Sequence, residues 1–327
     1  MHNTDSGAQR ALSQPRFTVV IPAFGAAQTI GSAIRSVLSQ TEQGFEVVVV
    51  DDGSVDDTAE RARSFTTDPR IRVLEQPNKG PAAARNKGIA GGSGEYVAML
   101  DADNLWLPEY LQMMGAALDA APAAPFAYTD AWVFDDETKT VQRRSAMSYT
   151  RPPERVADGR TFFLQLLERN FVHTSVTARR SALETVGGYD DSLWTGEDWD
   201  LWLRLTRAGG PPVRVSPRLA IHRTSPDSLS TDAALMIRNV CEIYRRFLDD
   251  PGTDAEARAI AERRLAYWTA MSRRREKPTR AWRLRGLAAA TKHKLLARRK
   301  WLEQPPEAVE RTLRAAGELD REVPAGS

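Results

Sequence analysis

The sequence predicts an α/β fold, in which a mostly parallel sheet is flanked by helices and followed by a helical C-terminal extension. Between residues 17 and 100, short apolar runs alternate with segments whose apolar residues recur at helical spacing. This alternation is typical of parallel sheets that carry helices on both faces. After residue 232 the sequence shows helical patterns and no strand pattern. The length of 327 residues suffices for one large α/β domain with an appendage.

The first strands are short runs of apolar and β-branched residues that stop at proline or at polar residues. The pattern predicts strands at 17–22, 45–50, 71–75 and 96–100. Helices are predicted between them, at 29–40, up to residue 65 before the third strand, and at 81–90. Either Asp56 or Asp57 is suited to cap the second of these helices.

The pattern loosens after Pro108. We expect strands at 126–134 and 171–178, and a polar loop at 141–160. Helices are expected at 111–118, 161–169, 181–186 and 199–208. Gly187 and Gly188 are placed to close the third of these helices.

Composition divides the chain into three predicted parts. Residues 1–15 form a polar, disordered tail without the apolar stretch of a signal peptide, residues 16–230 form the α/β domain, and residues 231–327 form a basic helical region. With no apolar run of about 18 residues, we expect a cytoplasmic protein. The single cysteine, Cys241, excludes an intramolecular disulfide and a cysteine metal cluster. A net charge of +2 gives no reason to expect a nucleic-acid partner.

Acidic pairs follow two of the predicted strands. Asp51 and Asp52 come after the second strand, and Asp101 and Asp103 come after the fourth. Because ligands of such sheets bind at the carboxyl ends of strands, both pairs should lie on one rim. Carboxylates suit a hard divalent cation whose remaining ligands come from a diphosphate. Each pair alone is also compatible with a solvated turn or a helix cap.

Two further motifs have both a structural and a functional interpretation. Glu197 and Asp198 precede an amphipathic helix, where acidic residues are stabilised by the helix dipole or where one of them acts as a general base. Periodicity alone favours the capping role. The segment 78–80 (NKG) offers backbone N–H groups and a lysine to a phosphate, although the P-loop pattern is absent.

Taken in order, these motifs resemble the family 2 glycosyltransferases of the GT-A fold over about residues 17–230. The matching segments are 18–24 (TVVIPAF), 36–40 (SVLSQ), 50–58 (VDDGSVDDT), 78–80 (NKG), 84–88 (ARNKG), 100–103 (LDAD), 187–190 (GGYD) and 196–204 (GEDWDLWLR). The sequence departs from many relatives in having Gly25 where asparagine is common. It also has Ser225 at a usual histidine position, while His222 stands where tyrosine is common.

The resemblance implies an inverting transfer from a nucleotide-diphosphate sugar, UDP being the favoured nucleotide, with Mg²⁺ or Mn²⁺ as cofactor. It implies that Asp198, with Glu197 beside it, is the general base, and that Asp103, with Asp101, contacts the metal. The implied donor-binding residues are Pro22, Ala23, Phe24, Asp51, Asp52, Lys79, Gly80, Arg85, Asp101, Ala102 and Arg223. The acceptor is a glycan, a lipid-linked molecule or a small molecule, consistent with synthesis of a glycan or a cell-envelope polysaccharide.

Two other functions and one membrane contact stay open at this stage. A sugar nucleotidyltransferase would want a glycine- and lysine-rich loop, whereas residues 23–29 hold one glycine and no lysine. A non-catalytic nucleotide-sugar-binding partner subunit is opposed by the retained acidic motifs. The basic segment 280–302 is compatible with peripheral contact on the inner membrane face, or with a helical cap that has a solvated basic surface, and the cap is favoured.

Overall fold

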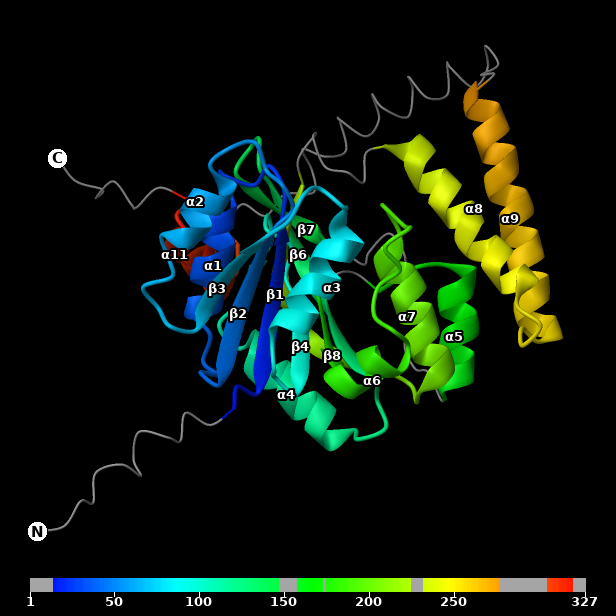
Figure 1. Ribbon diagram of the computed structural model, residues 1–327, viewed down its shortest axis with the longest axis horizontal. Helices are drawn as coiled ribbons and strands as arrows, with labels where there is room; N and C mark the ends of the chain where they lie inside the picture. The colour runs from blue at the N-terminus through cyan, green and yellow to red at the C-terminus, as the bar shows by residue number, and fades with distance from the viewer. Residues whose placement is uncertain (1–13, 147–157, 173–174, 225–231, 277–304, 320–327) are drawn as a thin grey trace, which may run out of the picture.

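The computed structural model describes residues 14–146, 158–172, 175–224, 232–276 and 305–319 (Figure 1). Within these residues nine strands form one sheet. The strands are β1 Phe17–Ala23, β2 Phe45–Asp51, β3 Ile71–Glu75, β4 Tyr96–Met99, β5 Leu105–Trp106, β6 Phe126–Asp135, β7 Thr140–Ser145, β8 Val176–Arg179 and β9 Val213–Thr224. Their order is β3-β2-β1-β4-β8-β6-β9-β5, and β7 pairs with β6.

The helices cover both faces of this sheet and its two ends (Figure 1). They are α1 Ile30–Leu38, α2 Thr58–Arg63, α3 Pro81–Gly91, α4 Tyr110–Ala120, α5 Gly159–Glu168, α6 Arg180–Thr185, α7 Glu197–Ala208, α8 Ala233–Asp249, α9 Ala255–Glu276 and α11 Glu307–Ala315. No helix of the described segments is long and apolar enough to cross a membrane.

The predicted α/β fold is confirmed, and its parallel part lies where the alternating pattern is clearest. Strands β1, β2, β3 and β4 pair in parallel. Beyond β4 the sheet is mixed, because β8 is antiparallel to both β4 and β6, whereas β9 is parallel to β6 and antiparallel to β5. The parallel half therefore carries the strand-end loops in which the acidic pairs were predicted.

Several predictions of the second half were wrong in detail. β9 was not predicted, since Pro217 interrupts its pattern and proline argues against a strand interior. β5 was missed because two residues carry no periodicity. Part of the predicted loop 141–160 belongs to β7, which pairs with β6, while residues 147–157 lie outside the described segments. β8 begins at Val176, later than the predicted strand 171–178, of which residues 173–174 are not described.

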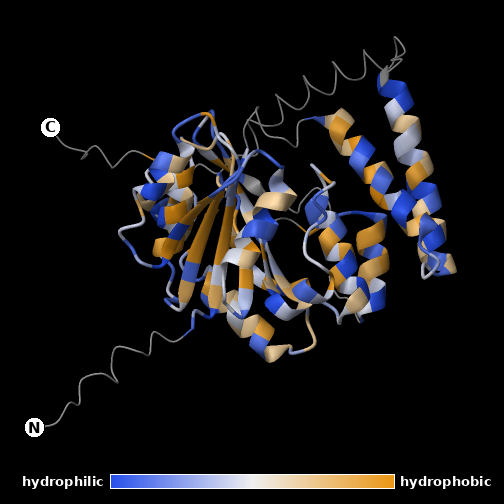
Figure 2. Ribbon diagram, viewed as in Figure 1, coloured by the Kyte–Doolittle hydropathy of each residue, from blue (hydrophilic) through white to orange (hydrophobic). Residues whose placement is uncertain are grey.

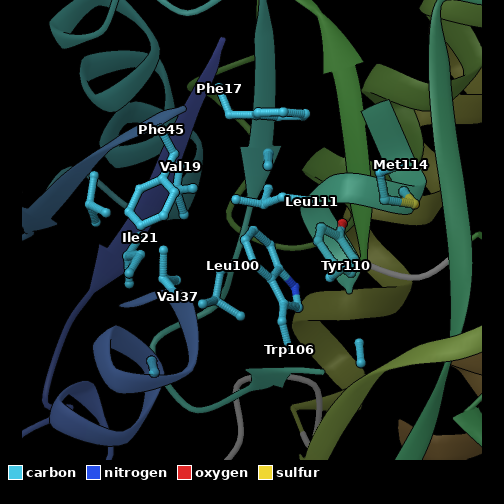
Figure 3. Packing of buried hydrophobic residues seen from close by; sticks show 14 of the residues in the cluster. Phe17, Val19, Ile21, Val37, Phe45, Leu100, Trp106, Tyr110, Leu111 and Met114 are labelled. Carbon is cyan, nitrogen blue, oxygen red and sulfur yellow. The ribbon is translucent and has the colours of Figure 1, made fainter. Parts of the chain in front are cut away.

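A large apolar cluster lies between the parallel strands and helices α1 and α4 (Figure 3). The ring of Trp106 stacks on Tyr110, with centroids 4.0 Å apart, and both side chains are fully buried. Tyr110 starts α4 and Trp106 belongs to β5, so this stack fixes the chain that leaves the 101–104 turn. Figure 2 shows how strongly the hydrophobic residues concentrate in the strands of this region.

The opposite face of the sheet is covered by α5 and α7, onto which α8 and α9 pack in one apolar cluster. The helix α11 instead lies beside α1, on the other side of the molecule from α8 and α9 (Figure 1). The C-terminal region is therefore helical where it is described, and its parts pack on two separate surfaces of the sheet domain. The basic segment 280–302, proposed for membrane contact, lies outside the described residues.

Candidate active site

Arg85 joins two motifs that are far apart in the sequence. It projects from α3 and is 5% exposed. Its Nη2 donates to Asp101 Oδ1 at 2.8 Å, and its Nη1 donates to Glu197 Oε1 at 2.5 Å. The Asp-Ala-Asp turn after β4 and the first turn of α7 are therefore neighbours at the carboxyl edge of the sheet. Burial opposes the charge of Arg85, but the attraction of Asp101 and Glu197 keeps its pKa well above the ordinary value.

Asp198 has a different environment from the adjacent Glu197. Glu197 is committed to the ion pair with Arg85, whereas among the described residues Asp198 forms no ion pair. Its Oδ1 accepts the Trp199 backbone N–H at 2.6 Å. Burial, and after it the negative charge of Glu197, raise the pKa of the Asp198 carboxyl above its ordinary range. The hydrogen bond from the Trp199 N–H lowers this pKa, but burial and the charge of Glu197 outweigh it.

The pKa of Asp103 is also raised. Burial, followed by repulsion from Asp101, raises the pKa of Asp103 to about 7, although Arg223 opposes the shift. Asp101 is held by Arg85 and by Asn104 Nδ2, which donates to Asp101 Oδ2 at 3.2 Å. The turn thus holds two oxygen ligands of like charge close together, an arrangement that a hard divalent cation would relieve.

The oxygen chemistry of this turn fits Mg²⁺ or Mn²⁺ with an incomplete protein shell. No group of three His, Cys, Asp or Glu side chains in the described segments is arranged to hold a metal ion. Asp101 and Asp103 would therefore hold the cation together with oxygens of a bound diphosphate, as the sequence prediction requires.

The two carboxylates after β2 have separate tasks. Asp52 accepts hydrogen bonds from Gln76 Nε2 at 2.8 Å, from the Lys79 N–H at 2.9 Å and from the Gly80 N–H at 2.8 Å. It thereby fixes the turn before α3, where Gly80 has a φ of +90°. Sequence reasoning missed this role because the partners are backbone groups of a loop 27 residues away.

Asp51 differs from Asp52 in keeping one carboxylate oxygen without a partner in the described part of the chain. The residue is 4% exposed, and its Oδ2 accepts the Ser54 N–H at 3.2 Å. Its Oδ1 is buried and has no hydrogen-bond partner in the described part of the chain. A buried carboxylate oxygen left unpaired is costly, so a donor group of a bound base or ribose would stabilise it.

We expect Asp52→Ala to destabilise the fold and to weaken nucleotide binding. It removes the acceptor of two backbone N–H groups, and hydrogen bonds to a charged group are worth about 1.5–3 kcal/mol each. For the two bonds together, a loss of about 3–6 kcal/mol in the free energy of unfolding, measured by urea denaturation, is expected on that scale. The matched control is Asp57→Ala nearby, because Asp57 is exposed and its side chain makes no cap hydrogen bond to α2. Equal stability of the two variants would contradict the assigned role.

The remaining predicted donor residues lie along the same edge. Pro22 and Ala23 end β1, and the Ala23 carbonyl accepts the Asp52 N–H at 2.8 Å. Phe24 projects from this edge with 55% exposure. Lys79 is exposed in the turn before α3, whereas Ala102 is buried between the two aspartates.

Two residues have surroundings that the sequence analysis did not anticipate. Trp194 was not predicted, yet it is 44% exposed and its indole packs on Gly80, where an added Cβ would lie 3.3 Å from the ring. Its place two residues before Gly196, in the segment that leads into α7, is the sequence signal that could have identified it. Arg223, a predicted diphosphate contact, is 5% exposed, and its guanidinium is paired with Asp136 and Glu318.

Comparison with curated proteins places the chain among glycosyltransferases. It is 28% identical over 204 residues to an uncharacterized glycosyltransferase of Rickettsia bellii, covering 61% of this chain and 27% of that protein. It is 33% identical over 200 residues to the succinoglycan biosynthesis protein ExoO of Rhizobium meliloti, covering 60% of this chain and 57% of that protein. The chain thus spans only about a quarter of the first relative and less than two thirds of the second.

A solved structure has the same fold over most of the chain. The mannosyltransferase PcManGT of Pyrobaculum calidifontis, in complex with GDP-Man and Mn²⁺, has a TM-score of 0.58 and 17% identity, covering 94% of this chain and 87% of that one. At this identity the likeness establishes the GT-A fold alone. The sequence profile described as "Glycosyl transferase family 2" matches residues 18–187, slightly more than half of the chain. The chain therefore belongs to glycosyl transferase family 2.

Proposed function

We propose that the protein transfers a sugar, with inversion, from a nucleotide-diphosphate sugar to an acceptor hydroxyl. The observation that carries the proposal is the bridge from Arg85 to both Asp101 and Glu197. It brings the Asp-Ala-Asp turn, which suits a metal-bound diphosphate, beside Asp198, which suits a general base. A direct displacement needs both groups at one reaction centre, on opposite sides of the transferred sugar.

Each side chain has a defined task in this mechanism. Asp51 accepts a hydrogen bond from the nucleoside through its buried Oδ1, and Asp52 holds the turn at 79–80 in place. Asp101 and Asp103 would hold the cation, which when bound neutralises charge on the diphosphate leaving group. Asp198 takes the proton from the acceptor hydroxyl as that oxygen bonds to the anomeric carbon.

The environment of Asp198 supports its assignment as base. A general base works best when its pKa is near the operating pH, and burial beside Glu197 raises the pKa of Asp198 in that direction. The ion pair with Arg85 engages the Glu197 carboxylate, so we assign the role of base to Asp198 and not to Glu197. Arg85 in turn holds the Asp101–Asp103 turn beside the first turn of α7.

The donor and acceptor are proposed by chemical class. The PcManGT complex holds GDP-Man and Mn²⁺, and the family resemblance favours UDP, so both nucleotides belong in a test. ExoO is named for succinoglycan biosynthesis, which supports a growing glycan as the acceptor class. Donor choice depends on side chains around Phe24 and Trp194, which are the exposed aromatic residues of this edge.

We expect one nucleoside diphosphate to raise the melting temperature more with Mn²⁺ present than in EDTA. Ligands that bind the folded state alone stabilise it by RT ln(1 + [L]/Kd), about 2.7 kcal/mol at a ligand concentration of 100 Kd. The measurement is a thermal-shift panel of UDP, GDP and dTDP with Mn²⁺, with Mg²⁺ and with EDTA. Stabilisation by none of these, in a sample with a cooperative transition, would refute the donor site and favour the non-catalytic alternative.

A further inference from the structure

The segment that follows α11 contacts Arg223 through the side chain of Glu318. The apolar residues Val309, Leu313 and Ala316 pack on the far edge of the sheet against Leu105 and Ile221. The Ala316 carbonyl accepts Ser32 Oγ at 2.9 Å and Arg35 Nη2 at 2.7 Å, both from α1. The end of α11 is thereby anchored to the core, close to the strand-end turns.

The chain then reverses sharply, and this aims Glu318 inward. Gly317 has a φ of +77°. Its N–H donates to the Arg314 carbonyl at 3.0 Å, and the Glu318 N–H donates to the Leu313 carbonyl at 2.8 Å. These two bonds are the Schellman motif that ends helices at a left-handed glycine. The position of Glu318 is therefore set by backbone geometry as well as by its charge.

Glu318 meets Arg223 in a buried, two-point ion pair. Arg223 Nη2 lies 2.7 Å from Glu318 Oε1, and Arg223 Nη1 donates to Glu318 Oε2 at 3.1 Å. The side chains are 4% and 8% exposed. Asp136 also pairs with Arg223, and Lys139 lies 3.8 Å from Glu318 and 2.8 Å from Asp136. The two acidic side chains of this cluster are therefore matched by two basic side chains.

Arg223 also contacts the turn that holds Asp101 and Asp103. Its Nε donates to the Asp103 carbonyl at 2.8 Å, and its backbone N–H donates to Asn104 Oδ1 at 2.9 Å. Asn104 in turn donates to Asp101 Oδ2 at 3.2 Å. A continuous chain of hydrogen bonds therefore runs from Glu318 through Arg223 to both aspartates of the turn.

We propose that Glu318 is a positioning residue that orients the Asp101–Asp103 turn through Arg223. Residues 316–319, which follow α11, would then be a component of the donor site. The proposal rests on the proposed function of that turn. A guanidinium held by Glu318 presents its Nε to the Asp103 carbonyl in one orientation. Groups that orient the direct ligands of a metal commonly change metal affinity or activity by roughly 10–100-fold when replaced.

The test compares Glu318→Gln with wild-type protein in two binding measurements. One is the affinity for Mn²⁺ in the presence of saturating nucleoside diphosphate, by electron paramagnetic resonance of free Mn²⁺. The other is the affinity for the same nucleotide in EDTA, by calorimetry. We expect the first to weaken roughly 10-fold or more, and the second to change less than about two-fold, because Glu318 does not reach the carboxylates after β2.

Two further variants separate positioning from general stability. Glu310→Gln removes the same charge from α11 itself, where among the described residues Glu310 forms an ion pair with Arg314 one turn later, and it should leave both affinities unchanged. Gly317→Ala keeps every charge but strains the turn, since side chains rarely adopt a φ of +77°, while the added Cβ itself would make only an ordinary contact, 3.6 Å from Arg35 Nη2. It should weaken Mn²⁺ binding in the same direction by a smaller factor, and it serves in place of Glu318→Gln should that variant not fold.

The outcomes are distinguishable. Unchanged Mn²⁺ affinity in Glu318→Gln or, if that variant does not fold, in Gly317→Ala would overturn the proposal while leaving the function intact. Equal weakening in Glu310→Gln would show a loss of helix stability and would also overturn it. Wild-type protein without any metal-dependent nucleotide binding would overturn both the proposed function and this inference.

Discussion

Asp198→Asn should lower the turnover of the enzyme by about 10²–10⁴-fold, which is the usual contribution of a general base. The amide has nearly the same shape and still accepts the Trp199 N–H through its oxygen, but it cannot take a proton. Nucleotide and Mn²⁺ affinity should stay within about two-fold of wild type, because in the proposed mechanism Asp198 acts on the acceptor and not on the donor. Release of nucleoside diphosphate from the donor, with water as acceptor, provides the assay while the natural acceptor is sought.

The pH dependence gives a second measurement on the same residue. A base acts in its deprotonated form, so kcat/KM should rise with pH through the pKa of Asp198, which burial and the charge of Glu197 hold above the ordinary range. The rise should be absent from the residual activity of Asp198→Asn. Glu256→Gln is the control, because Glu256 is also an acid in the first helical turn, on α9. Unchanged turnover in Asp198→Asn would remove Asp198 from the mechanism.

Asp103→Asn should abolish Mn²⁺-dependent nucleotide binding and yet make the metal-free protein more stable at pH 8. The pKa of Asp103, about 7 in the folded protein, lies above the ordinary aspartate value. A raised pKa means that the charged form is disfavoured in the folded state, so stability is lost as pH rises through that pKa. Asparagine carries no such charge, and roughly 1–2 kcal/mol of stability should return at pH 8 once partial solvent screening is considered.

The sign of this effect is tested by melting temperatures of metal-free wild type and Asp103→Asn between pH 5.5 and pH 8. The advantage of the variant should amount to a few degrees at pH 8 and should shrink as pH falls, because wild-type Asp103 then becomes protonated. Asp101→Asn is a contrasting variant, since it breaks the buried pair with Arg85 and should destabilise the protein. Lower stability of Asp103→Asn at pH 8 would show that Asp103 is not under electrostatic strain without metal.

Sequence patterns predicted the parallel half of the sheet to within a few residues. The strand predicted at 71–75 matches β3, and the helix predicted at 81–90 differs from α3 by one residue. These elements could be predicted because their residue patterns and the proline and glycine residues at their ends lie within short windows of the sequence. The mixed half was less predictable, since β5 and β9 exist only through pairing with distant partners.

The sequence by itself determined the family motifs, the α/β alternation and the presence of acidic pairs after two buried strands. These features are encoded within short windows, where strand runs and turn residues act on their neighbours. The tertiary structure decided which of these acids are available to a ligand. Asp52 is occupied by the backbone of residues 79 and 80, and Glu197 by Arg85. Asp51 keeps one unpaired oxygen, and burial raises the pKa values of Asp103 and Asp198. It also brought Glu318 to Arg223 across 95 residues. Charge partners are set by the meeting of separate elements, and no local pattern contains that information.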